Sequence, residues 1–399
     1  PEFVKQLKRN DGERTVAQAD MQPDDGRKQA VNVLQIFETE IGNKPMLQYW
    51  LTLGALGKRV TDHSEPFKNA KAKDRYINEL YQRLEAFHAV DDSDYDAFIS
   101  RLRSCGLTLF DELVPEKIQA LLWKHREEID HIQVMSSEAL IPWELVALKQ
   151  PGRKARPDAP FLAEMGLVRW LDHTAENRLP ARKLRLRDGR FAHVTPSYPA
   201  ASGHALPGAQ SEAQMLVDGF SAIACPTSSL KVLELLASPG KYDVLHFACH
   251  GVADTDAIWN SGLMMKGRMD NGHYLPDHLQ WDQVKNYADM REDGQPGPLV
   301  FINACQTGRS GETITSTGGF AQAFLNSGAD MFIAAQWSVG DYPATTFSTT
   351  LYEQLLNRKK SVTQAVAAAR KAARNNRELT WLSYVVYADP YAKVVIESG

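Results

Sequence analysis

Cysteine is scarce in this sequence, and its spacing argues against disulfide and zinc frameworks. The 399 residues include four cysteines, at Cys105, Cys225, Cys249 and Cys305, with no CxxC pair and no paired spacing typical of a disulfide framework. No apolar run approaches the roughly eighteen residues that a membrane-spanning helix requires. No charged-then-apolar signal peptide opens the chain. We therefore expect a soluble protein of the reducing cytoplasm.

The chain also lacks a strong net charge and the common nucleotide motifs. Its formal net charge of −4 is small for its length and gives no global case for nucleic-acid or membrane binding. The glycine-rich stretch 308–319 contains neither a Walker motif nor a GxGxxG turn. Five basic residues lie close together without aromatic residues among them, and we expect them to form a solvated strand face: Arg182, Lys183, Arg185, Arg187 and Arg190. We expect no cofactor, nucleic acid or membrane partner.

The first hundred residues read as a helical N-terminal region. The chain opens with Pro1-Glu2-Phe3 and no methionine, which indicates a piece of a longer protein. The apolar positions of 31–56 predict two helices broken near Gly42 and Pro45. Residues 76–87 and 95–102 repeat apolar side chains every three or four positions and predict two amphipathic helices. Their apolar stripes are either core or a docking face for a missing neighbour, and core is the safer interpretation.

From about residue 101 onward, helices and apolar strands alternate. We expect helices over 115–126, from 142, and over 228–236, 277–287, 318–326, 343–356 and 361–373, and residues 206–209 lead into a further helix through Met215 and Val217. We expect strands over 131–135, 191–195, 242–249, 299–304, 331–336 and 384–387, and a short strand that reaches Cys225. Strands that are continuous apolar runs, taken in turn with helices, predict a mostly parallel sheet covered on both faces. Functional sites on such sheets lie beyond the carboxyl ends of the strands.

Two of these strands end in residues that can carry chemistry. The run 244–249 leads to His250 and Gly251, and the run 299–304 leads to Cys305. If the strands are neighbours, the imidazole and the thiol face one cleft, where the histidine can take the proton of the thiol and make it a nucleophile. Such a pair suits attack on a peptide carbonyl. The backbone N–H groups of Gly251 and Cys305 are the candidates for stabilising the oxyanion that develops.

Less specific interpretations stay open for these residues. A single cysteine at a strand end is more often inert core than a nucleophile, and we assign Cys225 and Cys249 to the core. His246 lies inside its strand and is expected to be structural. A zinc site built from Cys249, His250 and Cys305 is conceivable, although no two of these residues have the spacing of a zinc finger.

Several motifs in order resemble one known family. They are Ile141-Pro142-Trp143-Glu144-Leu145, Leu206-Pro207-Gly208-Ala209 with Glu212, His246-Phe247-Ala248-Cys249-His250-Gly251, Asn303-Ala304-Cys305-Gln306-Thr307-Gly308, Gln336-Trp337-Ser338-Val339-Gly340-Asp341, and the late Trp381, Asp389 and Pro390. From about residue 100 to its end the chain resembles the CHAT family, caspase-like peptidases related to separase. The resemblance implies a caspase-like α/β fold over 101–399 and a cysteine endopeptidase with His250 as base and Cys305 as nucleophile. It also implies protein substrates and control by attached domains or a partner.

The resemblance further assigns Asp341 to a pocket for a basic P1 side chain, where a carboxylate would pair with Arg or Lys before the cut. Asp341 also stands just before Tyr342-Pro343, a position that suits a helix N-cap, and both roles stay open. Ser338 departs from separases, which tend to carry a second acid there. A catalytically idle scaffold of the same fold is the alternative function. Self-cleavage in the basic loop 152–156 is a further possibility.

Overall fold

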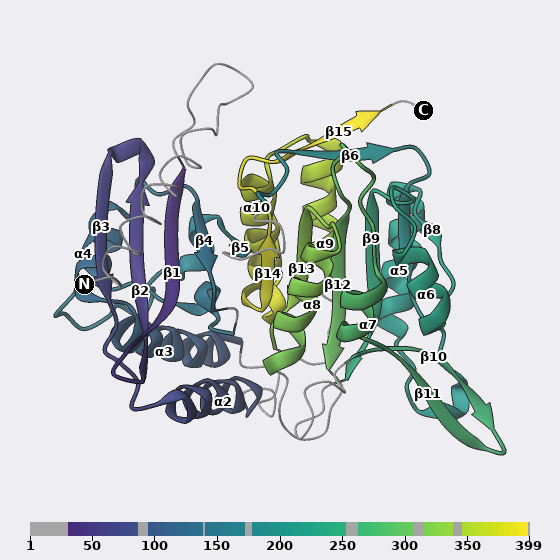
Figure 1. The fold of residues 1–399 in the computed structure, drawn as a ribbon, viewed down its shortest axis with the longest axis horizontal. Coiled ribbons are helices and arrows are strands. Elements are labelled where there is room, and N and C mark those ends of the chain that lie inside the picture. The colour runs from purple at the N-terminus through teal and green to yellow at the C-terminus, as the bar shows by residue number, and fades with distance from the viewer. Residues whose placement is uncertain are drawn as a thin grey trace.

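The computed structural model describes residues 31–86, 95–138, 140–171, 178–252, 262–306, 314–337 and 345–397. One large mixed sheet runs through this part of the chain, in the order β11-β10-β9-β12-β13-β14-β5-β4-β1-β2-β3, with β7 and β8 joined to it beside β9 (Figure 1). Its strands between β4 and β11 in chain order are β4 (Ile132–Ser136), β5 (Leu167–Leu171), β7 (Phe191–Val194), β8 (Ile223–Ala224), β9 (Val244–Val252), β10 (Gly262–Asp270) and β11 (His273–Gln280), and β6 belongs to a separate sheet. The later strands of this sheet are β12 (Leu299–Gln306), β13 (Met331–Ala335) and β14 (Tyr384–Tyr387).

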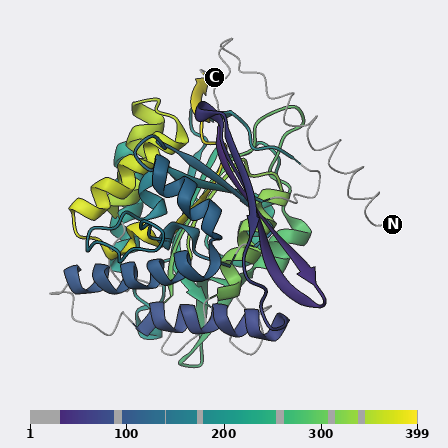
Figure 2. The same cartoon turned by 90° about the vertical axis from the view of Figure 1, so that its left-hand side faces the viewer.

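Helices cover both faces of this sheet, as the apolar strands predicted. The helices after the N-terminal region are α4 (Glu116–His125), α5 (Pro207–Phe220), α6 (Ser229–Leu236), α7 (Trp281–Tyr287), α8 (Ile314–Asn326), α9 (Thr345–Tyr352) and α10 (Val362–Asn375). Helices lie on both sides of the strands (Figure 2). Alternate residues of β12 face the two layers: Val300 and Ile302 pack in the core with α6, α7 and α8, whereas Phe301 packs in the core with α9 and α10. The mostly parallel sheet with helices on both faces is confirmed.

The expectation of two helices over 31–56 is wrong. This segment forms a hairpin of β1 (Asn32–Ile41) and β2 (Lys44–Leu53), followed by β3 (Lys58–His63). Gly42 and Asn43 have φ of 57° and 61°, the left-handed backbone of a two-residue hairpin turn. β1 then pairs in parallel with β4, so the N-terminal strands extend the main sheet.

The two amphipathic helices expected after this hairpin are present as α2 (Ala70–Ala86) and α3 (Tyr95–Leu113). α3 runs through residue 100, where we placed the boundary between an N-terminal region and a peptidase domain. That division stays a prediction.

A second hairpin lies between β9 and the helix that we expected from residue 277. β10 and β11 pair antiparallel over most of their length and project from the end of the sheet beside β9 (Figure 1). Asn271 and Gly272 form the turn with φ of 47° and 80°. A bulge lies between Met265 and Arg268, and at Gly267 a Cβ would approach the Leu275 carbonyl oxygen to 2.6 Å. The helix predicted from residue 277 begins only at Trp281.

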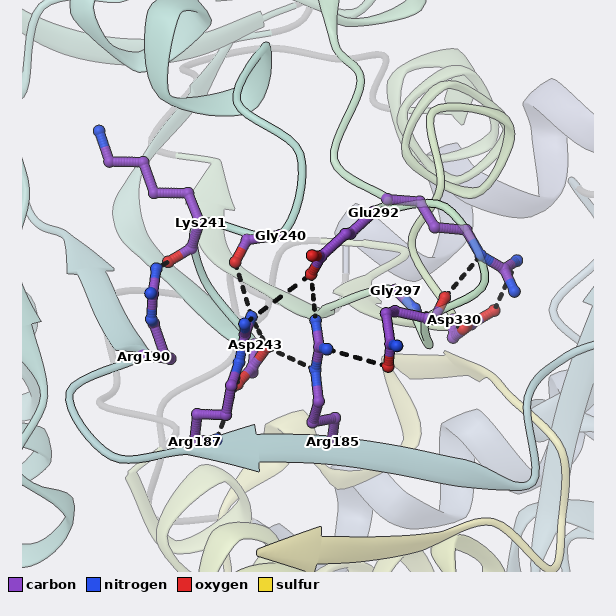
Figure 3. A network of polar contacts seen from close by, with 11 residues as sticks. Arg185, Arg187, Arg190, Gly240, Lys241, Asp243, Glu292, Gly297 and Asp330 are labelled. Atoms are coloured by element: carbon purple, nitrogen blue, oxygen red, sulfur yellow. Dashed lines mark hydrogen bonds and ion pairs between the residues drawn. The ribbon is translucent and has the colours of Figure 1, made fainter. Parts of the chain in front are cut away.

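The basic group around Arg185 is not the solvated face that we expected. Three of the five, Lys183, Arg185 and Arg187, lie in β6 (Lys183–Arg187), which pairs in parallel with β15 (Lys393–Glu397) in a small separate sheet. Arg187 donates to both carboxylate oxygens of Asp243, at 2.8 and 3.1 Å, and to the Gly240 carbonyl at 2.6 Å (Figure 3). Arg185 is buried and donates to Glu292 at 3.2 Å. Because Asp243 directly precedes β9, these contacts tie the small sheet to the start of that strand.

Candidate functional site

The strands that end in His250 and Cys305 are neighbours, as the sequence predicted. β9 and β12 pair in parallel over eight positions, from Leu299 opposite Val244 to Gln306 opposite Gly251. Residue 305 stands directly opposite His250 in this register. The backbone of the two strands therefore brings both positions to the same end of the sheet, the carboxyl end, where functional sites of such sheets lie.

The imidazole of His250 is buried and held by a backbone acceptor. His250 is only 3% exposed, and its Nε2 lies 3.0 Å from the carbonyl oxygen of His204. A carbonyl oxygen can only accept a hydrogen bond, so this contact places the ring proton on Nε2. Nδ1 is then the basic nitrogen of the neutral ring. A histidine with a fixed tautomer is a suitable general base.

The other predicted site residues lie at the edge of what the structure describes. The backbone of Cys305 is part of β12, but its side chain lies outside the described residues. Gly251 is in β9, one register step beyond His250. Asp341 lies outside the described residues, which end at the buried Trp337 and resume at Thr345 at the start of α9. The roles of these residues stay predictions.

A buried polar cluster lies behind the two strand ends. Glu212 of α5 accepts hydrogen bonds from Asn303 Nδ2 of β12 and from Ser348 Oγ of α9, both at 2.7 Å. Its Oε1 lies 3.4 Å from Nε2 of His246, on β9. Burial disfavours the charged carboxylate, but the charge of His246 and the hydrogen bonds outweigh this and lower the pKa of Glu212. We name Glu212, His246, Asn303 and Ser348 the Glu212 cluster.

Two tyrosines complete the hydrogen bonding of the Glu212 cluster. The hydroxyl of Tyr352 lies 2.9 Å from Nδ1 of His246, and the hydroxyl of Tyr384 donates to Oδ1 of Asn303 at 2.8 Å. The imidazole of His246 also stacks on Phe301, with ring centroids 4.8 Å apart. His246 is therefore the structural histidine that we expected. We expected no role for Glu212 from the sequence, although it forms part of one of the family motifs.

The Pro-Trp-Glu motif has a structural partner. Instead of the helix expected from residue 142, residues Trp143–Leu145 form one 3₁₀ turn, in which Glu144 makes a buried ion pair with Arg169 of β5. Arg169 also donates to the Ile141 carbonyl at 3.1 Å and lies 3.4 Å from Oε1 of Gln336. Gln336 immediately precedes Trp337, so this ion pair supports the segment that leads toward Asp341.

Cys225 and Cys249 occupy the core positions that we assigned to them. Cys225 and Cys249 are buried, and both pack in the core on the side of α6, α7 and α8. Burial raises the pKa of the Cys225 thiol. Among the residues that the structure describes, no three His, Cys, Asp or Glu side chains are grouped so as to hold a metal ion. Within the same residues, no helix is long and apolar enough to cross a membrane.

The family description that matches this chain covers most of its length. A match to the CHAT domain extends over residues 103–392. The chain belongs to the CHAT domain family. Two crystal structures of the Saccharomyces cerevisiae separase–securin complex resemble it with a TM-score of 0.50 each, at 10% and 13% sequence identity. At this identity the likeness shows a shared caspase-like fold. It covers 92% of this chain and 30% of each separase chain.

A curated relative of this CHAT protein is named as a protease. A probable protease of Vitiosangium sp. is 27% identical over 157 residues, which is 39% of this chain and 19% of the relative. The chain thus spans a minor part of the proteins that it matches. Together with the family, this relative supports a peptidase-type function.

Proposed function

We propose that this CHAT domain is a cysteine endopeptidase in which His250 and Cys305 form the catalytic dyad. The observation that carries the proposal is the parallel register of β9 and β12, which sets position 305 opposite a buried histidine of defined tautomer. The family and the probable-protease relative support the same chemistry.

In the proposed reaction, Nδ1 of His250 takes the proton of the Cys305 thiol, and the thiolate attacks the carbonyl carbon of the scissile peptide bond. The resulting imidazolium then protonates the leaving amine, and a thioester links Cys305 to the remaining part of the substrate. Water, deprotonated by His250, hydrolyses this thioester and regenerates the thiol. The His204 carbonyl accepts a hydrogen bond from the Nε2–H of His250 throughout, which also stabilises the imidazolium.

The backbone N–H groups of Gly251 and Cys305 are the proposed oxyanion donors. They stand on adjacent paired strands, one register step apart. Such fixed donors are worth about 10²–10³-fold in rate in other acyl-transfer enzymes. We further propose that Asp341 selects Arg or Lys at P1. This assignment rests on the family resemblance, and a peptide library cleaved by wild type and by Asp341→Ala tests it: an unchanged P1 profile rejects it.

A regulating protein partner is part of the proposal. The separase structures that this fold resembles are complexes with securin. We propose by analogy that a partner or an attached domain controls this site, and that its substrates are proteins. We also place the activity in the cytoplasm, where the buried thiols of Cys105 and Cys225 would stay reduced.

A comparison of two variants with the wild type tests the dyad. Wild-type protein, Cys305→Ala and His250→Ala are incubated with the proteins encoded beside this chain, and new amino termini are sequenced. We expect cleavage by the wild type alone. Cleavage retained by Cys305→Ala would exclude this residue as the nucleophile.

The alternative is a scaffold with an idle site. An electrophilic peptidyl probe distinguishes the two, because only an activated thiol reacts with it rapidly. Covalent labelling of Cys305 that depends on His250 favours the peptidase. Labelling no faster than that of an ordinary exposed thiol favours the scaffold.

A further inference from the structure

One edge of β9 changes its partner just before His250. β7 pairs with Val244–Phe247 along this edge, and β10 pairs with His250–Val252, while β12 occupies the opposite edge. Two residues of β9 therefore separate the end of one pairing from the start of the next. The residue that begins the second pairing is the proposed catalytic base.

A tyrosine hydroxyl lies at this change of partner. Tyr198, four residues after the end of β7, accepts a hydrogen bond from the backbone N–H of His250 at 3.1 Å. The same hydroxyl donates to the carbonyl oxygen of Met264 at 2.8 Å. Met264 is the residue of β10 that stands opposite His250 in the antiparallel register. The Tyr198 hydroxyl thus bridges a donor and an acceptor that face each other across the two strands.

The segment that carries Tyr198 holds the base at a second point. Its ring lies against the imidazole of His250, with centroids 5.2 Å apart and planes at 40°. Six residues later, the carbonyl of His204 accepts from Nε2 of the same imidazole. One short connection between β7 and α5 therefore contacts the backbone N–H, the ring face and the ring nitrogen of His250.

We propose that Tyr198 is a positioning residue for the base of the peptidase, setting the place of His250 by bridging its N–H to the Met264 carbonyl. The inference rests on the proposed function. A displacement of about 1 Å between reacting groups can cost about 100-fold in rate. The hydroxyl is therefore expected to affect the chemical step far more than it affects peptide binding.

Tyr198→Phe tests this role because it keeps the ring and removes only the bridging oxygen. Tyr274→Phe is the matched control: the Tyr274 hydroxyl also donates to a β10 carbonyl, that of Lys266, at 3.1 Å. Both variants, the wild type and His250→Ala are treated with a panel of peptidyl acyloxymethyl ketones that differ at P1. Modification of Cys305 is followed by mass spectrometry, and the fastest probe is used to measure kinact and KI. Thermal unfolding of each variant is measured in parallel.

We expect kinact of Tyr198→Phe to fall at least about 10-fold, with KI within about 2-fold of wild type. The unfolding midpoint should also fall by several degrees, because the His250 N–H and the Met264 carbonyl lose the hydroxyl between them, so kinact is measured at a temperature at which every variant is folded. Tyr274→Phe should match the wild type. A kinact for Tyr198→Phe within about 2-fold of wild type, or an equal loss in both tyrosine variants, overturns the positioning role while the peptidase stands. If wild-type Cys305 does not react, or reacts equally fast in His250→Ala, the proposed function itself fails, and the role of Tyr198 falls with it.

Discussion

Removing the carboxylate at the centre of the Glu212 cluster should destabilise the protein severely. Glu212 is 2% exposed and accepts hydrogen bonds from the part-buried Asn303 and the buried Ser348, so Glu212→Ala leaves both donors without their acceptor. Each buried donor without a partner costs about 1–3 kcal/mol, which predicts a loss of about 2–6 kcal/mol. His246 also loses the charge that faces it at 3.4 Å.

The measurement is urea unfolding followed by circular dichroism, with the free energy of unfolding compared between variants at pH 7. Asp218→Ala on the same helix is the matched control, since Asp218 is exposed and accepts a hydrogen bond from Gln214 at 2.8 Å. Its cost should stay within about 0.5 kcal/mol. Ser348→Ala removes one donor and leaves the carboxylate buried, so it should cost about 1–3 kcal/mol. A loss below about 1 kcal/mol for Glu212→Ala would refute the view that these hydrogen bonds stabilise the folded protein.

Three further outcomes are expected. Because the pKa of Glu212 is lowered in the folded state, its ionised form contributes stability that is present above the ordinary glutamate pKa of about 4.3 and is lost as the pH falls through the folded value. The deficit of Glu212→Gln should therefore shrink between pH 7 and pH 3, and a constant deficit contradicts this. Arg169→Met should lower the free energy of unfolding by about 3–5 kcal/mol, because the buried carboxylate of Glu144 loses its ion-pair partner. Adding Glu144→Leu should recover part of this loss. Equal losses in the single and double variants would argue against the importance of the ion pair. The basic side chains of loop 152–156 are exposed, so an active wild type should yield two fragments on a gel and Cys305→Ala should stay intact, whereas an intact wild type under activating conditions counts against self-cleavage.

The central strands could be predicted because burial on both faces leaves a continuous apolar run. β9, β12 and β13 are such runs, and their ends were placed closely enough to pair His250 with Cys305. The hairpin β1–β2 was mistaken for helices because it carries apolar side chains on both faces. Leu34 and Ile36 are buried on one face, and Phe37 and Trp50 pack against each other on the other face. Apolar residues on both faces of a strand can resemble the spacing of an amphipathic helix. Gly42 and Asn43 were the signal of a turn, and Asn271-Gly272 was the same signal in the second hairpin.

The sequence could predict only those parts of the candidate site in which single residues indicate a chemistry. A histidine and a cysteine at the ends of neighbouring strands are such residues, because the pair is typical of cysteine nucleophiles. The Glu212 cluster joins α5, β9, β12 and α9, with Glu212 and Asn303 91 positions apart, and no local pattern shows which polar side chains will meet. Tyr198 is a similar case. Its importance follows from the register of β9 and β10, which the sequence does not reveal.

The pairing of β1 with β4 has a practical consequence for any attempt to isolate the CHAT domain. The family match begins at residue 103, whereas β4 is enclosed between β5 on one edge and β1 on the other. A protein trimmed to the match would lose β1 and expose the backbone of β4 along an open edge, beside apolar residues such as Ile132 and Val134 that are now fully covered. Open apolar edges recruit strands from other molecules. Aggregation of such a fragment would then report a missing strand, and would say nothing about the catalytic centre.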